Sequence, residues 1–172
     1  LGYKTNSENT DYGISKANFN KPLAMPSGNY AICVQNASWI TKQWPIESWK
    51  ELLKILEKRD INLLFPSGNQ EEYNRANEIC SVSEKALALE VLPLNEIAFL
   101  IDNSEFTLCS DTGLAHLSAV VGTPSLTLYG PTDTRLIGTY GENQNHFVSP
   151  DSDISKISVK DVLTKLENLN FL

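Results

Sequence analysis

The tripeptide Asp111-Thr112-Gly113 is the part of the sequence that most directly indicates chemistry. It lies between a buried apolar run and a helical pattern, so the first amides of that helix can bind an anion. Gly113 permits close backbone approach, Thr112 adds a hydroxyl donor, and the helix dipole favours a phosphate by about 0.3 to 1 kcal/mol. His116, one turn on, is placed to face the same ligand. The alternative is that Asp111 or Thr112 only caps the helix and that His116 is a core histidine.

A lysine and a serine precede the sequence Gln-Trp-Pro in an earlier loop. Lys42 and Ser38 are four residues apart, and together they could hold the oxygens of a diphosphate, the lysine as a charge and the serine as a neutral donor. The alternative for Lys42 is a solvated surface lysine. Trp39, Trp44 and Trp49 are interpreted as packing residues rather than as a stacking platform.

Glu72 follows the loop at residues 66–69, where acidic residues of nucleotide-binding sheets bind ribose hydroxyls. The alternative is a first-turn carboxylate that the helix dipole stabilises. The turn at residues 130–133, Gly-Pro-Thr-Asp, indicates only a polar loop.

Two other hydrolytic chemistries were weighed for the same residues. Asp111-Thr112-Gly113 spells the aspartic protease signature, but it occurs once and a helical pattern follows it. A Ser/His/Asp triad built on His116 lacks a GxSxG nucleophile elbow. Both are disfavoured.

Apolar runs alternate with amphipathic stretches from residue 30 onward, which predicts strands alternating with helices. The expected fold is an α/β, Rossmann-like, doubly wound parallel sheet of five strands, with its ligand crevice beyond the carboxyl ends of the strands. The loops expected there are residues 36–44, 66–70, 111–113 and 130–133. Strands are predicted at 30–35, 62–65, 87–91, 106–110 and 125–129, and helices at 47–59, 71–80, 94–103, 114–121 and 158–169.

Composition limits the possible partners of the 172-residue chain. The net charge of −7 and the absence of a basic cluster argue against a nucleic-acid partner, and no apolar run reaches the length of a membrane span. Cys33, Cys80 and Cys109 lack CxxC spacing and are expected to be reduced, buried thiols in a cytosolic protein. The chain begins with Leu1 and shows no signal peptide, so we expect a fragment of a longer protein, with residues 1–28 as an interdomain linker and 29–172 as the domain.

Together these loops make the chain resemble the carboxyl-terminal half of the bacterial lipopolysaccharide heptosyltransferases of glycosyltransferase family 9, the heptosyltransferase I branch in particular. Four stretches carry the resemblance, and the last two are the most specific. They are Lys-Gln-Trp-Pro at 42–45 followed by Trp49, the 66–72 loop, Asp-Thr-Gly-Leu-Ala-His-Leu at 111–117, and Tyr-Gly-Pro-Thr-Asp at 129–133 running on to Gly138, Gly141 and Gln144.

The resemblance implies a GT-B architecture of two Rossmann-like domains, of which this chain would be the second, the domain that binds the donor ADP-L-glycero-D-manno-heptose. Ser38 and Lys42 would contact the diphosphate, and Glu72 the ribose. Asp111, Thr112, Gly113 and His116 would surround the diphosphate and the heptose. The heptose would pass, without a metal, to a 3-deoxy-D-manno-octulosonic acid (Kdo) residue of lipid A at the cytoplasmic face of the inner membrane, where the protein would be peripheral.

The chain departs from the family pattern at Ala37, where the family often has a second hydroxyl residue, so that one phosphate donor is missing. The resemblance also implies that the general base and the acceptor site belong to the amino-terminal domain. We therefore expect donor binding without turnover from these 172 residues alone. The alternatives are a family 9 enzyme with another acceptor or nucleotide sugar, and a non-catalytic nucleotide-binding module.

Overall fold

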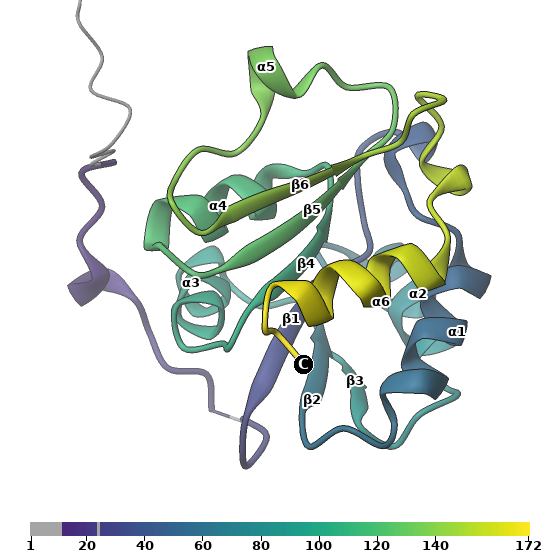
Figure 1. Ribbon diagram of the computed structural model, residues 1–172. Helices are drawn as coiled ribbons and strands as arrows, with labels where there is room; N and C mark the ends of the chain where they lie inside the picture. Colours follow the sequence, from purple (N-terminus) through teal and green to yellow (C-terminus); the bar gives the residue numbers. More distant parts are fainter. Residues whose placement is uncertain (1–11, 24) are drawn as a thin grey trace, which may run out of the picture.

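Six short strands form one parallel sheet in the computed structural model, which describes residues 12–23 and 25–172 (Figure 1). The strand order is β3-β2-β1-β4-β5-β6, as in a doubly wound sheet, and it reverses between β1 and β4. The strands are β1 (Tyr30–Val34), β2 (Asn62–Phe65), β3 (Ala86–Ala88), β4 (Thr107–Ser110), β5 (Ser125–Tyr129) and β6 (Gln144–Val148).

The predicted fold class is confirmed, but the predicted number of five strands is wrong because β6 was missed. β6 pairs in parallel with β5, from Ser125↔Gln144 to Tyr129↔Val148. Its sequence, Gln-Asn-His-Phe-Val, begins with three polar residues, and as an edge strand it is only partly buried. It therefore lacks the apolar run by which the buried strands were predicted.

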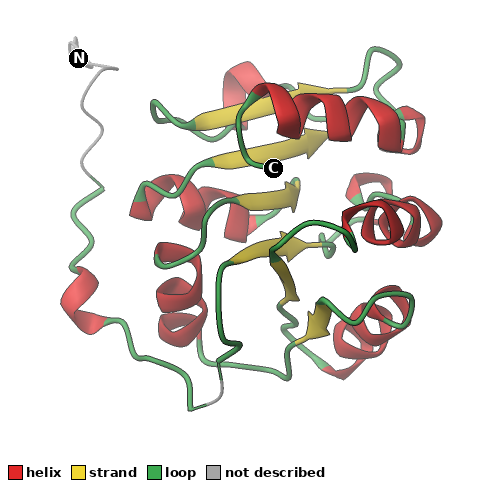
Figure 2. Ribbon diagram, turned by 60° about the horizontal axis from the view of Figure 1, so that its bottom comes forward, coloured by secondary structure: helices red, strands yellow, loops and turns green. Residues whose placement is uncertain are grey.

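Helices cover both faces of the sheet (Figure 2). On one face α1, α2 and α6 pack over a core that includes Ala31, Leu63 and Leu126, and on the other α3 and α4 pack over Ile32 and Leu64. All five longer helices occur where the sequence predicts them. The helices are α1 (Ile46–Leu56), α2 (Gln70–Cys80), α3 (Leu94–Asp102), α4 (Gly113–Val121), the short α5 (Thr134–Ile137) and α6 (Val159–Asn168), with 3-10 turns η1 (Lys16–Asn18), η2 (Ile40–Lys42) and η3 (Ile154–Lys156).

Two of the three tryptophans are the packing residues that the sequence predicts. Trp44 and Trp49 are fully buried, with ring centroids 5.2 Å apart in an edge-on arrangement. The indole N–H of Trp44 also donates to the carbonyl of Ile157 at 2.9 Å, which ties the loop after β1 to the segment before α6. The prediction that Trp39 is a packing residue is wrong. Trp39 precedes the turn η2 and is 67% exposed.

The three cysteines are buried and unpaired, as predicted. Burial raises the pKa of the Cys80 and Cys109 thiols to about 12, and it raises the pKa of Cys33 as well. These thiols therefore stay protonated at neutral pH and act as small apolar core groups.

The predicted linker falls partly on residues 1–11 and 24, which lie outside the described residues. Its described part runs beside α3 in both ribbon views (Figures 1 and 2). Phe19 and Met25 pack against the core beneath α3 and α4, and Lys16 forms an ion pair with Asp102 of α3 at 2.5 Å. This segment is therefore held against the domain by apolar and ionic contacts.

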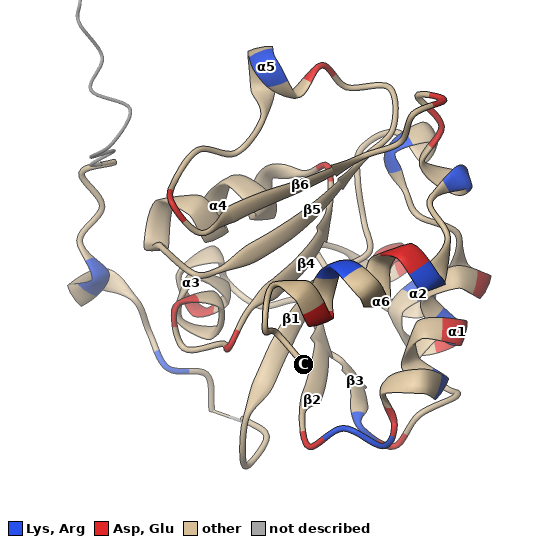
Figure 3. Cartoon of the chain, in the orientation of Figure 1, with Lys and Arg blue, Asp and Glu red and all other residues tan. Residues whose placement is uncertain are grey.

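Acidic and basic residues are interspersed along the outer helices α1, α2 and α6 (Figure 3). Some of them pair: Lys50 bonds both Glu47 and Glu78, and Arg59 bonds Glu167. No helix in the described part of the chain is long and apolar enough to cross a membrane.

Gly130, which ends β5, sits where three segments meet. A Cβ on Gly130 would lie 2.9 Å from the backbone nitrogen of Ile154 and 3.3 Å from the carbonyl oxygen of Thr41. Both obstructing atoms are backbone atoms, so neither can rotate away. The loops after β1 and β5 and the turn η3 can approach this closely only because residue 130 has no side chain.

We expect Gly130→Ala to lower the free energy of unfolding by about 1 to 3 kcal/mol, the usual cost of overpacking, as measured by urea denaturation. Gly113→Ala is the matched control, because a Cβ at Gly113 meets nothing within 4 Å. Equal stabilities of the two variants would contradict the close approach at Gly130.

Candidate functional site

The candidate site lies at the carboxyl ends of β1 and β4, where the strand order reverses. Polar residues follow both strands directly, Gln35 and Asn36 after β1 and Asp111 after β4. In doubly wound sheets the crossovers leave such neighbouring strands in opposite directions, which opens a crevice between their loops. The sequence-predicted loops after β1, β2 and β4 all lie at this edge of the sheet.

An ion pair joins the two central loops. Nζ of Lys42 is 2.7 Å from Oδ2 of Asp111, and their side chains are 20% and 7% exposed. The hydroxyl of Thr132, from the loop after β5, donates a hydrogen bond to the same Oδ2. The ring centroid of Trp39 lies 5.5 Å from Nζ of Lys42, within the range of a cation–π contact. Lys42 is therefore not the freely solvated lysine of the alternative interpretation.

A cavity of about 400 Å³ surrounds this ion pair. It brings together six of the seven sequence-predicted site residues, and Glu72 alone lies outside it. Its lining is Ser38, Trp39, Lys42, Asp111, Thr112, Gly113, His116 and Ile137. No second carboxylate lines this cavity among the described residues, which leaves Asp111 without the partner that an aspartic protease requires.

The amino terminus of α4 opens into the cavity without a side-chain cap. Thr112 occupies the N-cap position in an extended conformation, and its side chain accepts no bond from the first turn. The side chain of Asp111 is bonded to Lys42 and Thr132 instead. By contrast, the Asn69 side chain accepts from Glu72 N at the start of α2, and Ser158 caps α6 in the same way. The alternative in which Asp111 or Thr112 merely caps this helix is therefore wrong.

His116 is exposed on α4 and lines the cavity, so the alternative of a satisfied core histidine is wrong too. The second histidine, His146 on β6, does not line this cavity, and its Nε2 is 3.0 Å from the carbonyl oxygen of Thr139. Burial, more than the nearby His116, lowers the pKa of His146, which keeps that ring neutral. His116 is therefore the histidine that a ligand in this cavity can reach.

Glu72 lines a second cavity, of about 270 Å³, which shares Ser38 and Thr112 with the first. Oε2 of Glu72 accepts from the backbone nitrogen of Gly68 at 2.7 Å and from Nδ2 of Asn36 at 2.9 Å. Glu72 also lies in the first turn of α2, as the alternative interpretation supposes. The apolar side of this cavity is formed by Val34, Leu92, Leu94, Ile97 and Leu114.

Sequence reasoning missed Asn36 and Thr132, each of which bonds one of the predicted carboxylates. Asn36 is buried directly after β1, and its position at a strand end was the one signal that could have identified it. Thr132 lies in a loop that the sequence places at the ligand crevice and in the family resemblance, but no role was predicted for its hydroxyl, whose partner is 21 positions away.

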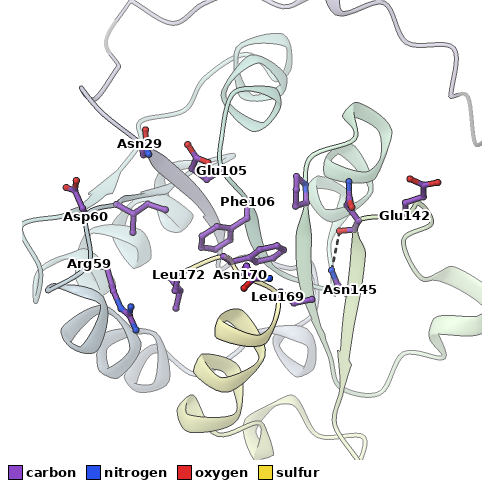
Figure 4. A pocket seen from close by; sticks show the side chains of 14 residues that line it. Asn29, Arg59, Asp60, Glu105, Phe106, Glu142, Asn145, Leu169, Asn170 and Leu172 are labelled. Atoms are coloured by element: carbon purple, nitrogen blue, oxygen red, sulfur yellow. Dashed lines mark hydrogen bonds between the residues drawn. The ribbon is translucent and has the colours of Figure 1, made fainter.

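A larger cavity, of about 600 Å³, lies at the amino ends of the strands, opposite the candidate site (Figure 4). It is lined by residues that immediately precede strands, such as Asn29, Phe106 and Asn143, and by the end of the chain. Phe106 stacks on Phe171 there, with centroids 4.9 Å apart. This cavity contains none of the predicted site residues, and in doubly wound folds ligands bind at the other edge.

Within residues 12–23 and 25–172, no group of three or more His, Cys, Asp or Glu side chains is arranged to hold a metal ion. Anion-binding groups dominate the first cavity instead: one ammonium, two hydroxyls and the open end of a helix.

Comparison with known proteins adds sequence and structural relatives. Residues 1–166 match the model of glycosyltransferase family 9 (heptosyltransferase). Lipopolysaccharide heptosyltransferase 1 of Escherichia coli (strain K12) is 35% identical over 172 residues, which cover 98% of this chain and 53% of the relative. Its namesake in Pseudomonas aeruginosa is 32% identical over 139 residues, which cover 81% of this chain and 39% of the relative.

Solved structures agree with the sequence relatives. E. coli heptosyltransferase WaaC with ADP superimposes with a TM-score of 0.87 at 32% identity, over 98% of this chain and 52% of that one. The structure of WaaC with ADP-2-deoxy-2-fluoro heptose gives 0.83 at 30% identity, over 98% and 51%. The chain thus spans about half the length of the relatives it matches. Since the family model covers nearly all of it, the chain belongs to glycosyltransferase family 9, the heptosyltransferases.

Proposed function

We propose that the chain is the donor-binding part of a heptosyltransferase that transfers L-glycero-D-manno-heptose from ADP-heptose to Kdo of lipid A. The observation that carries this proposal is the junction of two cavities: one holds Lys42, Asp111 and the open end of α4, and the other holds Glu72. A nucleotide sugar fits this arrangement, with its diphosphate and sugar in the first cavity and its nucleoside in the second. In this assignment residues 29–172 form the donor domain and 1–28 the interdomain segment.

The leaving group is the part of the donor that gathers negative charge as the bond from the anomeric carbon to the phosphate oxygen breaks. Lys42 and the uncapped amides of α4 lie in one cavity and can stabilise that charge, while the exposed Ser38 hydroxyl donates from the other side. Gly113 leaves room for the phosphate because a Cβ there would occupy otherwise open space. This charge stabilisation, without a metal, is the chemistry that we assign to these residues.

The nucleoside is assigned to the second cavity. The hydrogen bonds from Asn36 and Gly68 to the Glu72 side chain both engage Oε2, which leaves Oε1 available for the ribose hydroxyls. Asn36 and the backbone of Gly68 fix the carboxylate before a ligand arrives, so little ordering entropy is lost on binding. The aliphatic residues of this cavity offer an apolar surface to the base.

The heptose is assigned to Asp111 and His116. Both residues line the cavity; Asp111 precedes Gly113 in the sequence and His116 follows it. The acceptor hydroxyl must lose its proton as its oxygen bonds to the anomeric carbon, and we place the general base and the acceptor site in the other half of the whole protein. Turnover, the Kdo acceptor and a peripheral position at the cytoplasmic face of the inner membrane are accordingly proposed for the whole protein. Donor binding is proposed for these 172 residues.

Titration calorimetry of the chain with ADP, UDP and ADP-heptose, with and without magnesium, tests the proposal. We expect tighter binding of the two adenine nucleotides than of UDP, with the same affinity in both buffers. A preference for UDP would point to another nucleotide sugar, and binding of none of the three would contradict the assignment of a donor site to this chain.

Lys42→Ala should weaken ADP binding by about 1.5 to 3 kcal/mol, the range for a hydrogen bond to a charged group, without unfolding the chain. Lys54→Ala, which removes an exposed lysine of α1, is the control and should bind ADP like the wild type. Calorimetry reports both affinities, and an unchanged Kd for Lys42→Ala would show that this lysine does not contact the diphosphate.

Asp111→Asn should reduce the preference for ADP-heptose over ADP more than it reduces ADP affinity. The amide retains the size of the side chain but loses the negative charge that accepts strongly from sugar hydroxyls. The measured quantity is the ratio of the two dissociation constants. An equal loss for both ligands would argue against a contact between Asp111 and the sugar.

A further inference from the structure

The loop after β5, residues 130–133, has no role in the function proposed above, yet it reaches the reacting groups through Thr132. We propose that Thr132 is a positioning residue for donor-sugar recognition, which holds the Asp111 carboxylate in the orientation that the sugar meets. The proposal rests on the proposed function, because it takes Asp111 as the residue that contacts the sugar.

Two donors converge on a single oxygen of Asp111. The Thr132 hydroxyl and the Lys42 ammonium both bond Oδ2, and Oδ1 has no partner among the described residues. A carboxylate without such bonds can rotate about its last torsion and exchange its two oxygens. Two donors on Oδ2 therefore determine that Oδ1 is the oxygen left for a ligand in the cavity.

The two donors differ in what a phosphate does to them. Lys42 carries a full positive charge and is the group that a diphosphate attracts, whereas the Thr132 hydroxyl is neutral and is bonded to the carboxylate. Once the diphosphate engages Lys42, Thr132 remains as the donor on Oδ2. Because the Asp111 side chain is only 7% exposed, water would be a poor substitute for this hydrogen bond.

The backbone is packed closely upstream of Thr132 and forms a capped turn downstream of it. Upstream, Gly130 packs against the backbone of Ile154 and Thr41. Downstream, Oδ1 of Asp133 accepts from the backbone nitrogen of Arg135 at 3.0 Å, and Oδ2 accepts from its guanidinium at 2.7 Å. Close packing at Gly130 and the turn capped by Asp133 restrict the backbone around Thr132, which favours a constant place for its hydroxyl.

The test compares Thr132→Val, which keeps the shape and removes the hydroxyl, with Thr132→Ser, which keeps the hydroxyl. Dissociation constants for ADP and for ADP-heptose are measured by calorimetry, and thermal unfolding confirms that each variant folds. We expect Thr132→Val to lower the preference for ADP-heptose over ADP about tenfold, the effect of one hydrogen bond to a charged group, with ADP affinity changed less than about twofold. Thr132→Ser should retain the preference.

Thr134→Val, at the first position of α5, is the matched control and should leave both affinities unchanged. A double-mutant cycle with Asp111→Ala isolates the coupling, since Thr132→Val should have no further effect once residue 111 has no side-chain acceptor. If Val is not accommodated, Thr132→Ala takes its place in the same cycle.

The outcomes separate this proposal from the proposed function. A wild-type chain that prefers ADP-heptose, together with an unchanged preference in Thr132→Val or additive losses in the cycle, would overturn the positioning role alone. Wild-type binding of neither ligand would overturn the proposed function, and this proposal with it. Loss of the preference in Thr132→Val, with rescue by serine and no further loss in the Asp111→Ala background, would support it.

Discussion

The pairing of β1 with β4 is the constraint on which the site depends. Their register, Ile32↔Thr107 to Val34↔Cys109, brings the ends of the two strands to the same edge of the sheet at the point of strand reversal. Asp111 then lies across from the loop that carries Lys42, and the 2.7 Å ion pair links the two loops. A slip of one residue would exchange the two faces of β4 and bury the wrong side chains in both cores, so the buried strands specify this register strongly.

Hydrogen bonds between backbone and side-chain groups hold the loops next to this ion pair in place. Glu72 is held by the amide of Gly68 and the side chain of Asn36, and the carbonyl of Glu72 in turn accepts from Nε2 of Gln35. Oε1 of Gln35 accepts from Arg75, which also donates to the carbonyl of Trp44. The loop after β1 and the helix after β2 therefore form one hydrogen-bonded unit, which fixes the side of the second cavity that Asn36 and Glu72 line.

Much of the fold was predictable from the sequence, because buried parallel strands such as β4 and amphipathic helices such as α1 have distinct apolar patterns. The site was predictable where residue type and position coincide, as for Asp111 at a strand end and Gly113 at a helix start. β6 was not, because an edge strand is only partly covered and Gln144, Asn145 and His146 give no apolar run. Thr132 was not either, since its importance depends on a tertiary contact with a residue on another loop.

The bond from the Trp44 indole to the carbonyl of Ile157 spans 113 positions, and it anchors the loop that carries Lys42. Gly130 packs against Ile154 of the same late segment. Chains are synthesised from the amino terminus, and contacts between distant residues form only after both have emerged. The strands β1 and β4, and the contact of this loop with Arg75 of α2, can form while the chain is still growing, but the bond from Trp44 to Ile157 can form only when residues near 157 are available. The full set of contacts that hold the Lys42 loop can therefore be completed only after β1 and β4 have been synthesised.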